Sequence, residues 1–202
     1  MKAPKLFLYL VAAALFFVGC QKDEDNDLSP TPIAPVANPC DNVSCQNDGQ
    51  CISGDCFCKT GYDGNLCQNK KPIRSIEIDT VLVYDFPESN NGVSWDVGST
   101  GPQPDIYIVI SEGPNVIYTS SYCSDVFPSN RCLVVPQNNI TLSSPELSHS
   151  ISIYDYDQFS SDDFMGGIVF NPENAAFAQD FRNVMQIKLG DIEYRLKVKY
   201  NF

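Results

Sequence analysis

Apolar and polar residues alternate through the last part of the chain in the way typical of half-buried β-strands. In the clearest segment, 193–200, Tyr194, Leu196, Val198 and Tyr200 alternate with Arg195, Lys197 and Lys199. The same signal, broken by turn residues, predicts further strands over 75–84, 105–110, 115–119, 132–135, 140–142, 149–154, 167–170 and 185–189. Many short strands separated by turns favour an all-β fold, with an antiparallel β-sandwich over residues 71–202.

One segment of this region departs from the strand pattern. Residues 173–181 are predicted to form a short helix, because Asn171 is suited to cap it and Pro172 fits its first turn. Apart from this helix, the C-terminal domain is expected to contain strands and turns.

The N-terminus has the pattern of a targeting segment. Lys2 and Lys5 precede an apolar run over 6–18 that is short for a membrane span, and Gly19-Cys20 follows it. The run ending at Cys20 resembles a bacterial lipobox. This resemblance implies a signal peptide over 1–19, a lipid on Cys20 and anchoring of the protein to a membrane. The alternative, a signal peptide without lipidation, would leave an unpaired thiol in an oxidising compartment.

Residues 20–39 are too poor in bulky apolar residues to fold and are predicted to be a disordered, acidic and proline-rich tether. Lys22 followed by the acids of 23–25 resembles the export signal of surface lipoproteins in Gram-negative bacteria. This resemblance implies a place on the bacterial outer membrane, facing the cell exterior. An ordinary hydrophilic tether is the alternative.

Cysteine is dense in residues 40–68, which contain Cys40, Cys45, Cys51, Cys56, Cys58 and Cys67. So short a segment cannot be held by a core alone, and an even count in an exported chain predicts three disulfides with fifteen possible connectivities. A zinc site is disfavoured because the segment has no histidine. The Cys-rich pattern with its Asn47-Asp48-Gly49-Gln50-Cys51 run resembles an EGF-like module, which implies the pairs Cys40–Cys51, Cys45–Cys56 and Cys58–Cys67. The remaining pair, Cys123 and Cys132, is expected to staple a loop.

An acidic loop follows the predicted strand 149–154. It carries Asp155, Asp157, Asp162 and Asp163 within nine positions. Carboxylates this close repel one another unless a cation lies between them, and a flexible set of oxygen ligands suits Ca²⁺. A solvated acidic turn is the alternative, because aspartate is a common turn former.

The spacing of Asp155, Asp157 and Asp163, with the Phe164-Met165-Gly166 ending, resembles the third calcium-binding loop of a C2 domain. The family's first loop has a counterpart in the Gly- and Pro-rich segment between Asp96 and Asp105. The resemblance implies a C2-like sandwich in which Asp96, Asp105, Asp155, Asp157 and Asp163 hold Ca²⁺. Ile106 stands where the family usually has proline, which leaves Asp96 the less secure of the two first-loop ligands.

The formal net charge of the chain is -12. Removal of residues 1–19 would take away two lysines and no acid, leaving 25 acidic residues against 11 basic ones, or -14. This charge disfavours nucleic acid as a partner and opposes direct attraction to anionic lipid unless Ca²⁺ bridges the two.

The sequence offers little support for catalysis. The only histidine, His149, has no acid beside it in sequence and is expected to be a surface or strand-end residue, so the protein is not expected to be an enzyme. The favoured function is a cell-surface lipoprotein that acts as a calcium-dependent binding or adhesion module for an extracellular lipid, glycan or protein. The alternative is a metal-free accessory subunit or structural stalk of a surface enzyme or uptake complex.

Overall fold

The computed structural model describes residues 36–96, 103–127 and 129–202, of which 38–202 form one compact unit. The predicted signal peptide over 1–19, the predicted lipidation site at Cys20 and the tether as far as residue 35 lie outside the described residues. No helix within the described ranges is long and apolar enough to span a membrane.

The cysteine-rich segment forms two small hairpins. Strand β1 (Gln50–Ile52) pairs with β2 (Asp55–Phe57), and β3 (Tyr62–Asp63) pairs with β4 (Asn69–Lys70). Three disulfides join Cys40 to Cys51, Cys45 to Cys56 and Cys58 to Cys67, the pairs implied by the EGF-like resemblance. Because most of these short strands are exposed, the cross-links supply the constraint that a core supplies in larger domains.

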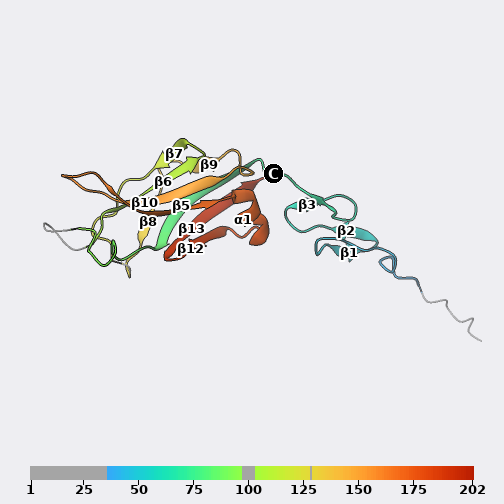
Figure 1. The fold of residues 1–202 in the computed structure, drawn as a ribbon. Coiled ribbons are helices and arrows are strands. Elements are labelled where there is room, and N and C mark those ends of the chain that lie inside the picture. Colours follow the sequence, from blue (N-terminus) through green and yellow to red (C-terminus); the bar gives the residue numbers. More distant parts are fainter. Residues whose placement is uncertain (1–35, 97–102, 128) are drawn as a thin grey trace, which may run out of the picture. The chain divides into compact units, whose positions relative to one another are not determined.

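The rest of the unit is a sandwich of two antiparallel sheets, shown in Figure 1. The first has the order β11-β10-β6-β7 and consists of β6 (Ile106–Glu112), β7 (Asn115–Thr119), β10 (His149–Asp155) and β11 (Asp163–Phe170). The second has the order β12-β13-β5-β8 and consists of β5 (Ser75–Asp85), β8 (Cys132–Val134), β12 (Val184–Leu189) and β13 (Ile192–Asn201), with β9 (Ile140–Leu142) also paired to β5. The all-β prediction is confirmed.

The core lies between the sheets and follows the alternation in the sequence. Ile108 of β6 and Ile153 of β10 are fully buried, as are Ile78 of β5 and Leu196 of β13. One hydrophobic cluster joins these residues across both sheets. Burial of such side chains stabilises the fold by about 1.5–3 kcal/mol each, and a register slip of one residue would turn each inward residue to the solvent.

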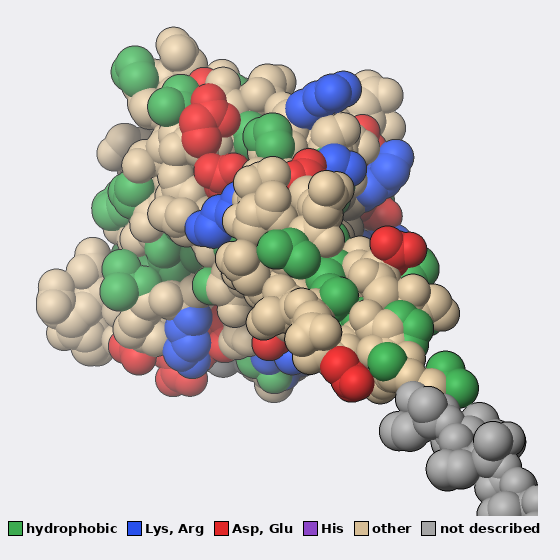
Figure 2. Space-filling model, turned by 90° about the vertical axis from the view of Figure 1, so that its right-hand side faces the viewer, with side chains coloured by type: hydrophobic (Ala, Val, Ile, Leu, Met, Phe, Trp, Pro, Cys, Tyr) green, Lys and Arg blue, Asp and Glu red, His purple; other side chains and the backbone are tan. Residues whose placement is uncertain are grey.

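Strand β13 has the two faces expected from its sequence. Tyr194, Leu196 and Val198 are buried, whereas the basic residues that alternate with them are paired with acids, of which Glu193 is itself buried. These pairs are Arg195 with Glu193 at 2.8 Å, Lys197 with Asp79 at 2.6 Å and Lys199 with Glu77 at 3.8 Å. The basic face of β13 is therefore a compensated sheet face. The surface in view in Figure 2 likewise carries both acidic and basic side chains.

The single helix of the described residues, α1 (Pro172–Ala178), begins one residue before the predicted start at 173 and has the predicted cap. Asn171 caps it by accepting a hydrogen bond from the Asn174 N–H at 2.7 Å, and Pro172 occupies the first turn. The helix ends before the predicted boundary at residue 181, because Asp180 and Phe181 both adopt a left-handed backbone.

Strand β11 begins at Asp163, four residues before the predicted start at Gly167. An irregularity in its pairing with β10 lies at Ile153 and Tyr154, opposite Gly166 and Phe164, so that Met165 is the additional residue. Gly166 has a φ of 141°, a conformation that favours glycine. The bulge interrupts the alternation of apolar and polar residues. The first half of the strand therefore lacks the pattern from which strands were predicted.

His149 is buried, with 1% of its surface exposed, so the expectation of a surface position is wrong. It begins β10 as expected for a strand-end residue, but it alternates with Ile151 and Ile153 and therefore points inward.

Two tyrosines of β13 form a matched pair for measuring the cost of a buried hydroxyl. Within the described residues the buried Tyr194 hydroxyl has no hydrogen-bond partner, whereas the Tyr200 hydroxyl donates to the Arg182 carbonyl at 3.0 Å. We expect Tyr194→Phe to raise the free energy of unfolding by about 1 kcal/mol and Tyr200→Phe to lower it by a similar amount. Urea denaturation with the disulfides intact measures both. A loss of stability in Tyr194→Phe as large as that in Tyr200→Phe would show that the Tyr194 hydroxyl has a hydrogen-bond partner.

Candidate functional site

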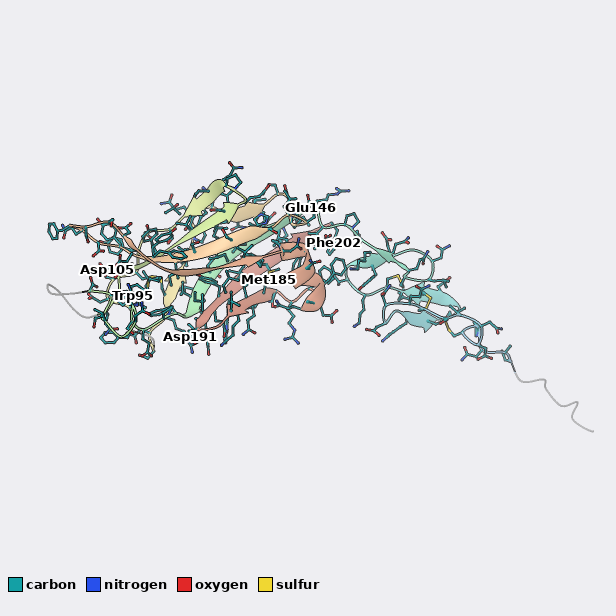
Figure 3. The ribbon with its side chains drawn as sticks, viewed as in Figure 1. Trp95, Asp105, Glu146, Met185, Asp191 and Phe202 are labelled. Carbon is teal, nitrogen blue, oxygen red and sulfur yellow. A yellow bond between two sulfur atoms is a disulfide. The ribbon has the colours of Figure 1, made fainter. Side chains whose placement is uncertain are left out.

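The candidate site lies at the end of the sandwich where β6 begins and β10 ends. In the antiparallel ladder Asp155, the last residue of β10, lies opposite Ile106, the first residue of β6. Asp105 directly precedes β6, so the strand register alone brings Asp105 beside Asp155. Figure 3 labels Trp95 and Asp105 at this end of the sandwich and Glu146 at the other.

Asp155 is the most buried carboxylate of the site, with 0% of its surface exposed. Its Oδ1 accepts a hydrogen bond from the Asp105 N–H at 2.7 Å, while no described residue donates to its buried Oδ2. Burial raises the pKa of Asp155 to about 6. The hydrogen bond from Asp105 opposes this shift, and the carboxylates of Asp96, Asp157 and Asp105 add to it. The charged form of Asp155 is therefore poorly compensated in the protein alone.

Asp96 is fixed in place by the residue before it. Trp95 is 8% exposed, and its indole N–H donates to the Pro87 carbonyl at 2.7 Å. Burial raises the pKa of Asp96, and so do the negative charges of three neighbours: Asp105, Asp157 and Asp125. The electrostatic influence shows that these carboxylates share one region. Residues 97–102, between Asp96 and Asp105, lie outside the described part of the chain.

Asp105 connects the segments that surround the site. Its N–H donates to Asp155, and its carbonyl accepts from the Tyr156 N–H at 2.8 Å. Its Oδ1 accepts a hydrogen bond from the Asp125 N–H at 2.8 Å. Asp105 is half-buried, and these hydrogen bonds hold it between the loop after β10 and the loop that carries Asp125.

Asp157 lies in a loop that a neighbouring aspartate closes. Its N–H donates to Asp162 Oδ1 at 3.1 Å, and Asp162 Oδ2 accepts from the Tyr107 hydroxyl at 2.7 Å. Tyr107 stacks on Tyr154, with ring centroids 5.3 Å apart, so the hydroxyl is held by the sheet. Burial raises the pKa of Tyr107, and the hydrogen bond to Asp162 adds to this effect. Asp162 thus positions the loop of Asp157.

Asp163 occupies a different place from the other four predicted ligands. It is the first residue of β11 and lies opposite Asp155 in the ladder, with an exposed side chain. The charges of Asp105 and Asp157 raise the pKa of both Asp96 and Asp155, whereas Asp163 is not among the charges that do so. Four of the five predicted residues therefore share one electrostatic environment, and Asp163 lies beside Asp155 at its exposed margin.

The cluster supplies oxygen donors of the kind that hard cations prefer. In the described ranges, no three Asp, Glu, His or Cys side chains converge closely enough to hold a metal ion as they stand. Two carboxylates about 4 Å apart repel by about 1 kcal/mol in a well-solvated site. The chemistry of the residues fits a calcium ion, with Asp155 Oδ2 as the donor that most lacks a partner, although they do not form a closed cage.

His149 lies at the other end of β10 from Asp155 and takes no part in this cluster. Its Nδ1 is 3.2 Å from the Leu147 carbonyl, and its Nε2 is 3.4 Å from a carboxylate oxygen of Glu112. Glu112 belongs to β6 and is distant in sequence from His149. The pairing of β6 with β10 brings the two residues together.

Two residues of the site were not predicted from the sequence. Asp162 was part of the acidic run, but the spacing used to choose ligands passed over it in favour of Asp163. Asp125 lies in a different loop, between β7 and β8. Its position two residues after Cys123 was the available signal, because a disulfide fixes the chain on either side of it.

No protein-family model matches the chain, and no curated protein matches it in sequence. Several solved structures resemble it in backbone. A structure described as that of a C2 domain is 11% identical, with a TM-score of 0.39, and the match covers 61% of this chain and 96% of that one. A C2 domain of plant extended synaptotagmin 1 is 11% identical, with a TM-score of 0.37 and coverages of 66% and 99%.

A human GIVD cytosolic phospholipase A2 is 12% identical with a TM-score of 0.40, and the match covers 65% of this chain but 17% of the phospholipase. The neighbours thus include C2 domains. At these TM-scores the likeness assigns neither a family nor a ligand to this chain.

The raised pKa of Asp155 predicts a pH-dependent stability in calcium-free buffer. An acid whose pKa is higher in the folded state takes up its proton in the native protein first, so its contribution to stability increases as pH falls from about 7 to about 5. Asp155→Asn removes this titration and keeps an oxygen that can accept from Asp105. We therefore expect the variant to be more stable than the wild type near pH 7, and this difference to shrink near pH 5.

Urea denaturation of both proteins at the two pH values measures the difference directly, and comparison with the variant cancels the titration of carboxylates that do not interact with Asp155. A difference that is the same at both pH values would show that Asp155 does not titrate in this range.

Proposed function

We propose that this protein is a cell-surface binding module that binds its ligand through a calcium ion at the acidic end of the sandwich. The observation that carries the proposal is the buried Asp155 Oδ2, which no described residue compensates and which lies among three other carboxylates. A buried carboxylate without a partner is costly, and a cation removes that cost.

Asp96, Asp105, Asp155 and Asp157 would hold the ion, with Asp163 as the fifth predicted ligand. When bound, Ca²⁺ would supply positive charge and coordination positions open to oxygen atoms of a ligand. The protein's own contribution is to position the donors. Asp105 holds Asp155 by a hydrogen bond, and Asp162 holds the loop of Asp157.

Exposed aromatic side chains close to the acidic loop support a ligand that also has apolar surface. Phe159 is 92% exposed between Asp157 and Asp162, and Phe164 is 60% exposed directly after Asp163. Together with a cation, these rings suit a partner with an anionic group beside an apolar part, whether lipid, glycan or protein.

The surface location belongs to the same proposal. It rests on the sequence before residue 21, where a basic start, an apolar run and Cys20 resemble a lipoprotein processing site. A lipid on Cys20 would hold the module on the bacterial outer membrane, and the acidic tether would extend it toward the exterior. We propose a non-catalytic role, because the clustered carboxylates suit ion coordination better than acid–base chemistry.

A metal-free accessory subunit or structural stalk is the second candidate. It is favoured by the absence, in the described part of the chain, of three converging metal-binding side chains. The two candidates differ in whether calcium stabilises the fold.

Calcium should stabilise the full-length chain, purified in detergent, relative to the same protein in chelator. Extracellular modules commonly bind Ca²⁺ with a Kd of about 10⁻⁴ to 10⁻³ M, so saturating calcium should add about 1–3 kcal/mol to the free energy of unfolding. Asp157→Asn should weaken binding by about tenfold with little effect on stability in chelator, because Asp157 lies in a loop. Thermal unfolding and titration calorimetry measure the two quantities.

Glu146→Gln is the matched control, because it removes one exposed acidic charge at the other end of the sandwich (Figure 3). It should bind calcium as the wild type does. Absence of binding heat at millimolar calcium, or equal affinities for the wild type and Asp157→Asn, would indicate that the loop is a solvated acidic turn. That result would favour the metal-free accessory subunit or stalk.

Cys20→Ser should prevent lipid attachment and move most of the protein from the membrane fraction to the soluble fraction, or stall its processing. Cell fractionation followed by mass spectrometry of the N-terminal peptide tests this expectation. Normal processing and an unchanged share in the membrane fraction would refute the anchor.

A further inference from the structure

A third loop runs beside the two segments that carry the predicted ligands. The stretch around Cys123 pairs with the start of β6 through hydrogen bonds in both directions between Ile106 and Cys123, at 2.9 and 2.7 Å. Two residues later the Asp125 N–H donates to Asp105 Oδ1, and the Val126 N–H donates to the Pro104 carbonyl at 2.9 Å. The loop is therefore hydrogen-bonded to the Asp105 segment at three successive points.

The same loop also contacts the segment that carries Asp155 and Asp157. The ring of Tyr122 stacks on the ring of Tyr156, with centroids 4.7 Å apart and an angle of 7° between the planes. Because Tyr156 lies between the two aspartates, this stack places the third loop against both predicted ligand segments.

A disulfide fixes the loop to the second sheet. Cys123 is bonded to Cys132, which is fully buried at the start of β8 and lies opposite Val83 of β5. Beside it the Arg131 guanidinium lies 3.6 Å from the centroid of the Tyr84 ring. The loop after β7 is thus held at both of its ends, one in each sheet.

The backbone at Asp125 does not explain why the residue is charged. Its φ is 48°, a left-handed conformation in which Asn is accepted as readily as Asp, and its only described hydrogen bond is donated by its own N–H. A carboxylate here adds repulsion to the cluster, since Asp125 is one of the charges that raise the pKa of Asp96. The Asp125 side chain is exposed, and no described hydrogen bond neutralises its charge.

We infer that Asp125 is a further ligand of the calcium site, presented by the loop that the Cys123–Cys132 disulfide holds against Asp105. This inference rests on the proposed function, because it adds a donor to the same ion. The buried, unpartnered Oδ2 of Asp155 is the independent sign that a cation belongs in this cluster. The disulfide then acts as a positioning element for a metal ligand as well as a cross-link in the fold.

Titration calorimetry with CaCl₂ on the full-length chain in detergent tests the inference. Asp125→Asn keeps the left-handed backbone and the N–H donor, so it should fold as the wild type does and bind calcium about tenfold more weakly. Glu146→Gln should bind as the wild type does. The paired Cys123→Ser and Cys132→Ser variant should lose affinity to a similar extent, and adding Asp125→Asn to it should cause little further loss, because both changes remove the same contact.

The outcomes separate this inference from the function on which it rests. If the wild type gives no calcium binding, the proposed function fails and the inference with it. If the wild type binds and Asp125→Asn binds equally well, the inference alone is overturned. If the cysteine variant folds and Asp125→Asn still weakens it by the full factor, Asp125 remains a ligand, but the disulfide does not position it.

Discussion

The burial of the Asp155 carboxylate at the end of β10 is the constraint on which the acidic end of the sandwich depends. One of its oxygens accepts from the Asp105 N–H, and the other is buried without a described partner. A carboxylate in this position ionises at a cost of several kcal/mol unless a proton or a cation compensates it. The strands cannot relieve the cost by slipping, since a one-residue shift would expose Ile151 and Ile153. The core thus holds in place a charge that is unfavourable by itself.

The sequence was sufficient for the parts of the fold that follow from local periodicity. The two faces of β13 and the cap of α1 at Asn171 were predicted correctly, because alternation and capping are properties of neighbouring residues. The beginning of β11 was not, since its bulge at Gly166 interrupts the period of two. The buried position of His149 could have been predicted by extending the alternation of Ile151 and Ile153 backward by one step.

The site was predictable only in part, for a related reason. Asp155 and Asp157 were found from spacing within one loop, and Asp105 from its place at the start of a strand. The closeness of Asp125 depends on the path of the chain from β7 to β8, and the role of Asp162 depends on a hydroxyl from Tyr107, 55 residues away in sequence. No local pattern contains contacts between segments so far apart. The pairing of β6 with β10 brings Tyr107 beside Tyr154, close to the loop of Asp162, and the bridge between Ile106 and Cys123 brings Asp125 beside Asp105.

Three of the acidic segments are anchored close to their aspartates by an apolar or covalent contact: Trp95 before Asp96, Ile106 after Asp105 and Cys123 two residues before Asp125. This arrangement lowers the conformational entropy lost when an ion binds, while the repulsion between the charges remains to be relieved. Binding and stability are then coupled at this end, because an ion that binds only the native state stabilises it. The cysteine-rich segment is held by three disulfides, whose effect does not depend on calcium. Under the proposed function, removal of calcium should loosen the tip of the sandwich and leave the cross-linked segment folded.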